Sequence, residues 1–337
     1  MRVLVTGGGG YIGSVMCEML LDQGFKVTVL DRFFFGQEAL DHVKDRIRIV
    51  RDDVRWVPSS IMNGVDAVID MAAMSNDPAG ELNPQKTFEI NYKGRTRIAN
   101  MAKKHKVGRY VLASSCSVYG FKKEIVTEET PPNPLTAYSK ANAMWERHVL
   151  PLADRNFCVT ALRQSSVYGP SSRMRFDISL NAMTLKLFRG EKLQVMRDGT
   201  QKRPVIHIKD TSNAFITVLK ADQDLVNGEI FNAGSNDQNL KIFDIAKLVA
   251  ESNGKKFDYE WYGSPDYRSY TVSFDKIRKV LGYKTKHTPQ QGAREMFKAL
   301  EGGKVISDER SVTLLWYKKL YEMSDIVDNV RLKGKIL

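Results

Sequence analysis

Two hydroxyl side chains stand where a parallel α/β fold places its reactive groups. Residues 109–113 predict a buried strand, and Ser115 follows at its carboxyl end. Tyr138 comes 23 residues later, at the start of a predicted helix. A phenol has a pKa of about 10, so it acts as a base only beside positive charge. Tyr138 could then take a proton from a substrate oxygen that Ser115 holds. Taken alone, each fits a packing tyrosine or a strand-end turn at least as well.

The stretch from Val3 to Asp31 indicates what such a pair would act beside. It predicts a strand, a glycine turn, a helix and a second strand that ends in an acid. Gly8, Gly10 and Gly13 satisfy the dinucleotide fingerprint, and Gly7 begins its three-spaced variant. The first glycines allow a tight turn close to a pyrophosphate, which the helix N-terminus attracts, and Gly13 lets the helix pack close to the strand. A turn that binds nothing is the alternative.

The acid at the end of the second strand bears on which dinucleotide binds. Asp31 lies 18 residues past Gly13, where a carboxylate can accept hydrogen bonds from an adenosine ribose. The same carboxylate would repel a 2′-phosphate, which favours NAD over NADP. Arg32 weakens this preference, because a neighbouring cation could tolerate the extra phosphate.

Later strand ends carry residues that suit the same cofactor. Asp53 and Val54 follow the predicted strand 47–50 and could flank an adenine ring, although an exposed strand-end loop is an equal alternative. Ala72 and Ala73 end the next strand, where small side chains leave room for a cofactor.

Strands and helices alternate at short intervals, which is typical of a Rossmann-type, doubly wound parallel α/β sheet. We expect residues 1–170 to form the NAD-binding domain, rejoined by about 205–235. Residues 171–204 and 236–310 would form a smaller C-terminal α/β lobe that binds the substrate. Residues 311–337 predict a helical tail, for which packing on the body or on a second subunit is the default.

The bulk composition is that of an ordinary globular protein. The formal charge of +12 is spread along the 337 residues, which favours a solvated basic surface, or attraction of an anionic substrate, over a nucleic-acid arm. Three unpatterned cysteines indicate a reducing compartment, and no spacing predicts a metal site. The first strand begins at residue 2 or 3, and no apolar run could span a bilayer. We therefore expect a cytoplasmic protein with no membrane or nucleic-acid partner.

Taken together, the motifs resemble the extended short-chain dehydrogenase/reductase family, in its branch of nucleotide-sugar epimerases and dehydratases typified by UDP-galactose 4-epimerase. The resemblance covers roughly the first 300 residues and is specific for the family but weakly specific for the substrate. The stretches that carry it are Thr6–Gly13, Met71–Ala73, Ile90–Gly94, Ser114–Gly120, Asn133–Tyr138, Leu162–Pro170, Arg203–Asp210 and Phe231–Gly234.

The resemblance implies a role for individual residues. Ser115 and Tyr138 match the catalytic pair, and Arg203 matches an arginine on the substrate diphosphate. Arg268, in the segment 265–268, resembles a second such arginine. The implied cofactor residues are Gly7, Gly10, Tyr11, Ile12, Gly13, Asp31, Arg32, Asp53, Val54, Ala72, Ala73, Asn91, Tyr138 and Asn142. The substrate set is Ser75, Ser115, Arg203 and Arg268, with Arg173 and Arg175 added for their charge and loop position.

One departure from the family concerns the catalytic helix. The family pattern is Tyr-x-x-x-Lys, and the fourth residue after Tyr138 is Asn142. Residues four apart lie on one helix face, so the family lysine can hold the nicotinamide ribose while its charge favours the phenolate. Three readings stay open. Asn142 suffices as the third catalytic residue, a distorted helix start brings in Lys140, or the protein binds NAD and a nucleotide sugar with little turnover.

A second departure concerns the reaction. Family dehydratases resemble Thr-Asp-Glu where this chain has Ser115-Cys116-Ser117, so 4,6-dehydration is disfavoured. We expect an NAD-dependent epimerase or dehydrogenase that acts on a nucleotide-diphospho sugar by hydride transfer, usually at C4. A weakly catalytic binding protein is the alternative, and a dehydratase or ketoreductase is the second. The resemblance also implies a homodimer packed through the helices that begin near residues 89 and 137.

Overall fold

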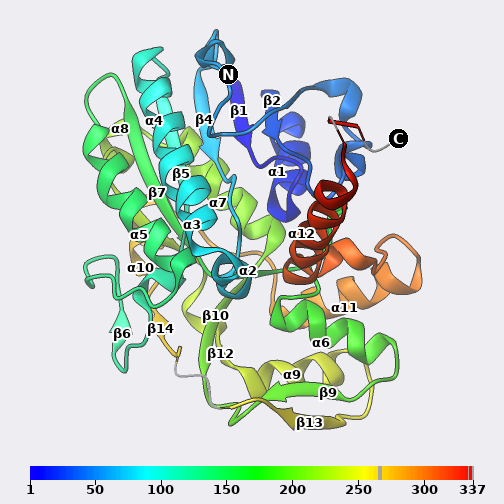
Figure 1. Ribbon diagram of the computed structural model, residues 1–337. Coiled ribbons are helices and arrows are strands. Elements are labelled where there is room, and N and C mark those ends of the chain that lie inside the picture. Colours follow the sequence, from blue (N-terminus) through cyan, green and yellow to red (C-terminus); the bar gives the residue numbers. More distant parts are fainter. Residues whose placement is uncertain (265–267, 333, 336–337) are drawn as a thin grey trace.

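The computed structural model describes residues 1–264, 268–332 and 334–335. Its centre is a seven-stranded parallel sheet with the order β11-β7-β5-β4-β1-β2-β3 (Figure 1). The doubly wound fold is confirmed, and its seven strands include those expected from the apolar runs at 47–50 and 109–113. The seven strands are β1 (Arg2–Thr6), β2 (Lys26–Asp31), β3 (Ile47–Arg51), β4 (Ala67–Asp70), β5 (Arg109–Ser115), β7 (Cys158–Gln164) and β11 (Ile230–Ala233).

Helices cover both faces of this sheet and bury one apolar core on each side. One core contains side chains of α1 (Tyr11–Asp22) and α7 (Ile208–Lys220). The other contains side chains of α4 (Arg95–Lys104) and α5 (Ala137–Val149). A π-helical turn, Glu89–Gly94, leads directly into α4. The short helices α2 (Asp77–Leu82), α3 (Pro84–Phe88) and α8 (Gln223–Val226) complete the connections.

A smaller group of elements lies beyond the carboxyl end of the main sheet (Figure 1). Its helices α6 (Ser179–Phe188), α9 (Ile242–Ser252) and α11 (Pro289–Glu301) share an apolar cluster with strand β9. The remaining elements are β6 (Ile125–Val126), β8 (Ser166–Tyr168), β9 (Leu193–Met196), β10 (Lys202–His207), β12 (Asn239–Lys241), β13 (Tyr259–Tyr262), β14 (Thr271–Val272) and α10 (Asp275–Leu281).

Only part of the segment 205–235, which we expected to rejoin the main sheet, does so. Helix α7 packs against α1, and β11 pairs with β7 at the sheet edge. Strand β10, in contrast, pairs with β8 and β12 in a separate three-stranded sheet. The exact domain boundaries remain a prediction.

The carboxyl-terminal helix α12 (Thr313–Val330) returns across the molecule to lie beside α2 (Figure 1). Its Tyr317 is buried and packs with Met74 and Ala79. The described part of the tail is therefore helical over Thr313–Val330, as expected, and this helix packs on the body of the protein.

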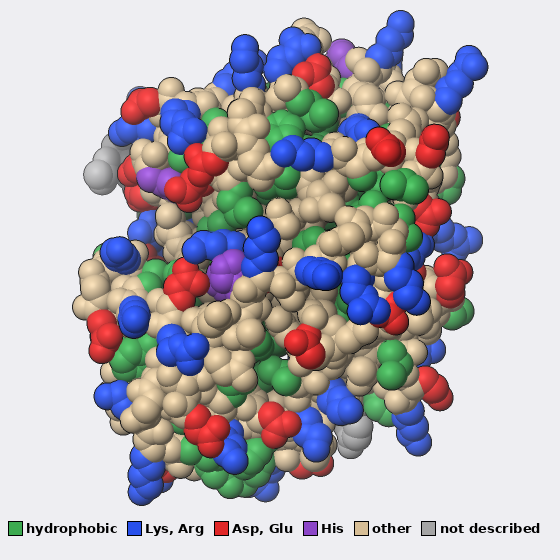
Figure 2. Space-filling model, turned by 180° about the vertical axis from the view of Figure 1, so that it is seen from behind, with side chains coloured by type: hydrophobic (Ala, Val, Ile, Leu, Met, Phe, Trp, Pro, Cys, Tyr) green, Lys and Arg blue, Asp and Glu red, His purple; other side chains and the backbone are tan. Residues whose placement is uncertain are grey.

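The surface in Figure 2 carries dispersed Lys and Arg side chains with Asp and Glu among them. This distribution accords with a basic charge spread along the chain. No helix in the described ranges has the length and apolar character needed to cross a bilayer.

Candidate active site

Two adjoining cavities open at the carboxyl end of the main sheet. The first has a volume of about 170 Å³ and is lined by the glycine turn and the ends of β2, β3 and β4. The second has a volume of about 530 Å³ and lies between the sheet and the smaller group of elements. Among the residues that the structure describes, six line both cavities, namely Tyr11, Ile12, Ser75, Tyr138, Gln164 and Arg175.

The glycine turn has the close packing that its spacing predicts. Gly7 has a φ of +72°, and a Cβ there would lie 2.9 Å from the Ala72 backbone. A Cβ on Gly13 would lie 2.3 Å from the carbonyl oxygen of Gly7. Gly10 is the N-cap of α1 and provides no side-chain cap. The first-turn N–H groups of α1 therefore face the cavity without a side-chain acceptor at the cap, which suits an anionic phosphate.

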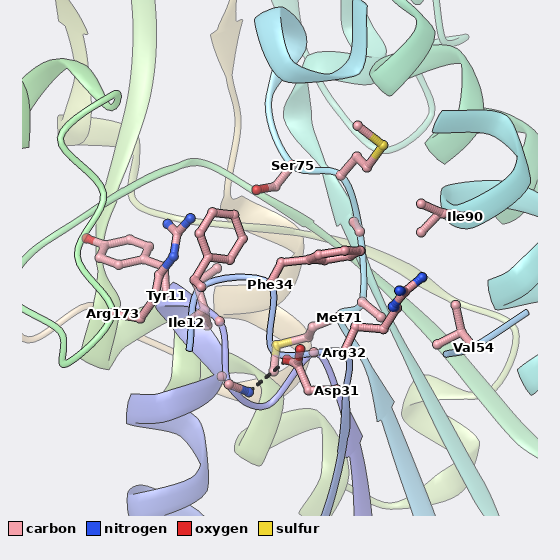
Figure 3. A pocket seen from close by; sticks show the side chains of 18 of the residues that line it. Tyr11, Ile12, Asp31, Arg32, Phe34, Val54, Met71, Ser75, Ile90 and Arg173 are labelled. Carbon is pink, nitrogen blue, oxygen red and sulfur yellow. Dashed lines mark hydrogen bonds between the residues drawn. The ribbon is translucent and has the colours of Figure 1, made fainter. Parts of the chain in front are cut away.

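The acid that ends β2 fastens this turn. The Asp31 carboxylate accepts a hydrogen bond of 2.9 Å from the backbone N–H of Gly9, dashed in Figure 3, and one of 2.7 Å from that of Phe33. Burial raises the pKa of Asp31, and the hydrogen bonds from Phe33 and Gly9 oppose that rise. Asp31 lines the first cavity, so it can both hold the turn and meet a ribose.

The far end of the first cavity is lined by Val54 and Ile90, opposite Tyr11 and Arg173 (Figure 3). Asp53 also lines it, but its carboxylate accepts hydrogen bonds from the side chains of Arg55 and Arg32. The expected acid therefore lines this cavity, although it is ion-paired rather than free.

Three aromatic side chains, called the aromatic roof below, line this cavity, namely Phe34, Phe35 and Tyr317. Phe34 lies across the middle of the cavity in Figure 3. The Tyr317 ring packs edge-on to Phe34 at 6.0 Å between centroids and lies 5.4 Å from Phe35. Trp316 donates a hydrogen bond of 2.6 Å to the carbonyl of Phe34. Phe34 and Tyr317 also line a neighbouring cavity of about 640 Å³, so they stand between the two spaces.

Ser115 and Tyr138 come together in the second cavity, as the sequence predicts. Ser115 ends β5, and its Oγ accepts a hydrogen bond of 3.1 Å from the N–H of Ser117. Tyr138 lies in the first turn of α5, which a capping box of Thr136 and Ser139 begins. The helix start is thus regular and leaves Lys140 exposed to solvent, which argues against the reading in which Lys140 reaches the site.

Two asparagines assigned to the cofactor are buried behind the cavity walls. Asn91 exchanges hydrogen bonds with the backbone of Met74, at 2.8 and 3.0 Å, and so holds the loop after β4. Asn142 accepts a hydrogen bond of 3.2 Å from Arg95. Neither is among the described residues that line the first cavity. Asn91 thus holds the loop after β4, and a direct cofactor contact of either asparagine stays a prediction.

The four candidate arginines divide between the cavities. Arg203 and Arg268 line the second cavity, and Arg175 lines both. Burial lowers the pKa of Arg175, but the Asp177 carboxylate outweighs this effect and holds that pKa above its ordinary value. Arg173 differs from the expectation, because it lines only the first cavity, where its guanidinium lies 3.6 Å from the Phe35 ring centroid. Burial lowers the pKa of Arg173 to about 10. Residues 265–267 of the segment that precedes Arg268 lie outside the described residues.

Sequence reasoning missed several residues of the site, and Gln164, Tyr317 and Arg95 matter most here. Gln164 lines both cavities, and its place at the carboxyl end of β7 was a usable signal. Tyr317 lies far along the chain in a segment with no motif. Arg95 is buried behind the site at the start of α4, where its charge resembled that of an exposed helix face.

Comparisons with known proteins agree with this geometry. The sequence model of the NAD dependent epimerase/dehydratase family matches residues 3–234. The chain belongs to this family. The UDP-glucose 4-epimerase of Lactobacillus helveticus is 30% identical over 314 residues, which cover 85% of this chain and 93% of that protein. A dTDP-glucose 4,6-dehydratase of Streptomyces niveus is 28% identical and covers 84% of this chain and 88% of its own length.

A solved structure has the same fold. MoeE5 in complex with UDP-glucuronic acid and NAD has a TM-score of 0.80, is 25% identical, and covers 90% of this chain and 100% of its own. The family thus includes epimerases and dehydratases, and membership alone does not decide which reaction this chain catalyses.

Proposed function

We propose that this enzyme uses NAD to oxidise a carbon of a nucleotide-diphospho sugar, usually C4, and returns the hydride to give the epimer. The observation that carries the proposal is the position of Tyr138, which lines both the dinucleotide cavity and the second cavity. A phenol at that junction can meet a sugar hydroxyl at the place where the sugar would meet a nicotinamide.

The residues present suit NAD in the first cavity. The uncapped start of α1 provides N–H groups for the pyrophosphate, and Asp31 is placed for the adenosine ribose. When bound, NAD supplies a hydride acceptor. The cavity volume of about 170 Å³ is below the range common for ligand sites, so we expect Phe34 and Tyr317 to shift when it binds.

Side chains of the protein would carry out the proton transfer. Tyr138 takes the proton of the sugar hydroxyl while the C–H electron pair leaves as hydride, so the carbinol becomes a ketone. Ser115 holds the oxygen on which the negative charge develops. Return of the hydride to the opposite face of the ketone, with the proton from Tyr138, gives the epimer.

The second cavity suits an anionic substrate and gives little support to dehydration. Arg175, Arg203 and Arg268 line it, which favours a diphosphate. Its described carboxylates are Asp77 and Asp177, and each is paired with an arginine at 2.9 Å. Carboxylates held as ion pairs are poor acids for the elimination of water.

The deciding experiment is incubation of the purified protein with UDP-, GDP-, dTDP- and CDP-sugars. We expect an epimer by NMR from at least one of them, with no net accumulation of reduced nicotinamide. Net reduction of NAD would indicate a dehydrogenase, and a 4-keto-6-deoxy product would indicate a dehydratase. If the protein binds NAD but forms no product from any of these sugars, a binding protein would be favoured.

Substitution of Arg203 by Gln tests the substrate assignment. Loss of a charge-assisted contact to the diphosphate should raise KM about 10–100-fold and change kcat little. Arg48→Gln removes an equal charge from the exposed edge strand β3 and should leave KM unchanged. An unchanged KM in the Arg203 variant would remove this residue from the substrate site.

Substitution of Tyr317 by Ala tests the aromatic roof. We expect bound NADH to dissociate about tenfold faster, because the variant loses the buried ring that packs on Phe34 and Phe35. Release can be followed by NADH fluorescence. Leu315→Ala, which alters an exposed residue of the same helix, should release NADH at the parent rate.

The family resemblance also leads us to propose a homodimer. Sedimentation at several protein concentrations would test it, and a monomer at all of them would contradict it.

A further inference from the structure

The proposed chemistry needs a positive charge near Tyr138. A phenol becomes a useful base near neutral pH when a cation stabilises its phenolate. The position one helical turn after Tyr138 holds the neutral Asn142, and Lys140 is exposed to solvent. The charge must therefore come from another element.

Arg95, the first residue of α4, places a guanidinium against Asn142. Its side chain is 1% exposed, and its Cζ lies 3.2 Å from the ring centroid of Trp145 on α5. One Nη donates to Asn142 Oδ1 at 3.2 Å, and the other donates to the carbonyl oxygens of Asp70 and Ala113 at 2.9 Å each. These carbonyls belong to the carboxyl ends of β4 and β5, the edge of the sheet where the site lies.

The guanidinium of Arg95 spans from the sheet to the catalytic helix. Its Nε lies 3.6 Å from an Asp70 carboxylate oxygen, whereas both Nη groups face neutral acceptors. Asp70 also accepts hydrogen bonds from the hydroxyls of Thr6 and Tyr110, so Arg95 is not its only partner.

Arg95 is joined through Asn142 to the helix that carries the reacting phenol, one turn after Tyr138. Burial lowers the pKa of Arg95, while interactions with Asp70, Tyr110 and Tyr138 oppose that decrease. On the cavity side, Tyr138 also interacts with Arg175, which is paired with Asp177. Arg175 thus lines both cavities together with Tyr138, and Arg95 contacts the same helix from the buried side.

Asn142 is oriented by the same contact. A guanidinium only donates hydrogen bonds, so the amide must present Oδ1 to Arg95 and direct Nδ2 elsewhere. This Nδ2 is buried and has no hydrogen-bond partner among the residues that the structure describes. A buried donor left over in this way is the kind of group that a ligand hydroxyl satisfies.

We propose that Arg95 and Asn142 together replace the single lysine of the family pattern. Arg95 is a positioning residue that supplies the positive charge behind Tyr138, and Asn142 supplies the hydrogen-bond donor toward the cofactor. This inference rests on the proposed function for Tyr138, and it removes the reason to read Asn142 as a sign of lost activity.

Relocation of the charge is the first test. We expect Arg95→Met to lower kcat about 30–100-fold and to move the acid limb of the pH–kcat profile about one pH unit upward, with KM for the sugar within threefold of the parent. The double variant Arg95→Met/Asn142→Lys should have a kcat at least tenfold higher than that of Arg95→Met. Lys104→Met removes an exposed charge from the same helix and should change neither quantity. A folded Arg95→Met protein with the parent kcat and pH profile would overturn the proposal.

A second variant retains the Arg95–Asp70 pair, in case Arg95→Met does not fold. Asn142→Asp places an anion against Arg95 and neutralises it in place. We expect the same upward movement of the acid limb, and an unchanged limb would overturn the proposal.

Cofactor binding gives a readout that does not need turnover. Asn142→Ala should raise the NAD dissociation constant about tenfold in equilibrium titration, and an unchanged constant would overturn the donor role. If the parent binds NAD but converts no nucleotide sugar, the proposed function fails while the donor role is still tested by this titration.

Discussion

Tyr138→Phe should lower kcat by about 10²–10⁴-fold, the usual effect of losing a general acid–base group. The ring that lines both cavities is retained, so KM for the nucleotide sugar and the affinity for NAD should change by less than threefold. Steady-state assays of the epimer, together with NAD titration, measure all three quantities.

Tyr92→Phe is the matched control for this result. It removes the same hydroxyl from a half-buried tyrosine that lines neither of the two site cavities. Its kcat should equal that of the parent. A Tyr138→Phe enzyme with a kcat within threefold of the parent would assign the proton transfer to another group.

Gly13→Ala should abolish NAD retention, with a rise of the dissociation constant of at least about 100-fold. The new Cβ would lie 2.3 Å from the Gly7 carbonyl oxygen and 2.6 Å from Gly8 Cα. Both neighbours are backbone atoms of the pyrophosphate turn, so the turn itself must move. Overpacking of this kind also destabilises a fold by about 1–3 kcal/mol, which should lower Tm. Isothermal titration and thermal unfolding separate the two effects.

Gly108→Ala provides the comparison. Its Cβ would meet only the Asp66 carbonyl oxygen, at an ordinary 3.6 Å, and its φ is not in the left-handed region. NAD affinity and Tm should both stay at the parent values. Retention of NAD by a folded Gly13→Ala protein would show that the turn does not hold the pyrophosphate.

The parts of the site that local sequence encodes were predictable. Each strand of the main sheet is a short apolar run, and the glycine spacing is dictated by backbone contacts such as the one between Gly13 and Gly7. Ser115 and Tyr138 could be paired because the carboxyl ends of parallel strands and the helices that follow them meet at one edge.

The parts that depend on distant packing were not predictable. Tyr317 reaches the cofactor cavity from a helix near the end of the chain, and no local pattern indicates that return. Arg173 and Arg175 are two residues apart in a loop, yet only Arg175 reaches the second cavity. The contact between Arg95 and Asn142 joins residues 47 apart, and a charged residue at a helix start usually faces solvent.

The carboxylate of Asp31 has a consequence for engineering of coenzyme preference. An acid at this position repels a 2′-phosphate, so its removal is the direct way to admit a phosphorylated ribose. Here the same acid accepts hydrogen bonds from the N–H groups of Gly9 and Phe33, so its removal would also loosen the turn that we propose holds the pyrophosphate. A redesigned variant would lose affinity for both coenzymes together, and a compensating brace for that loop would have to be designed first.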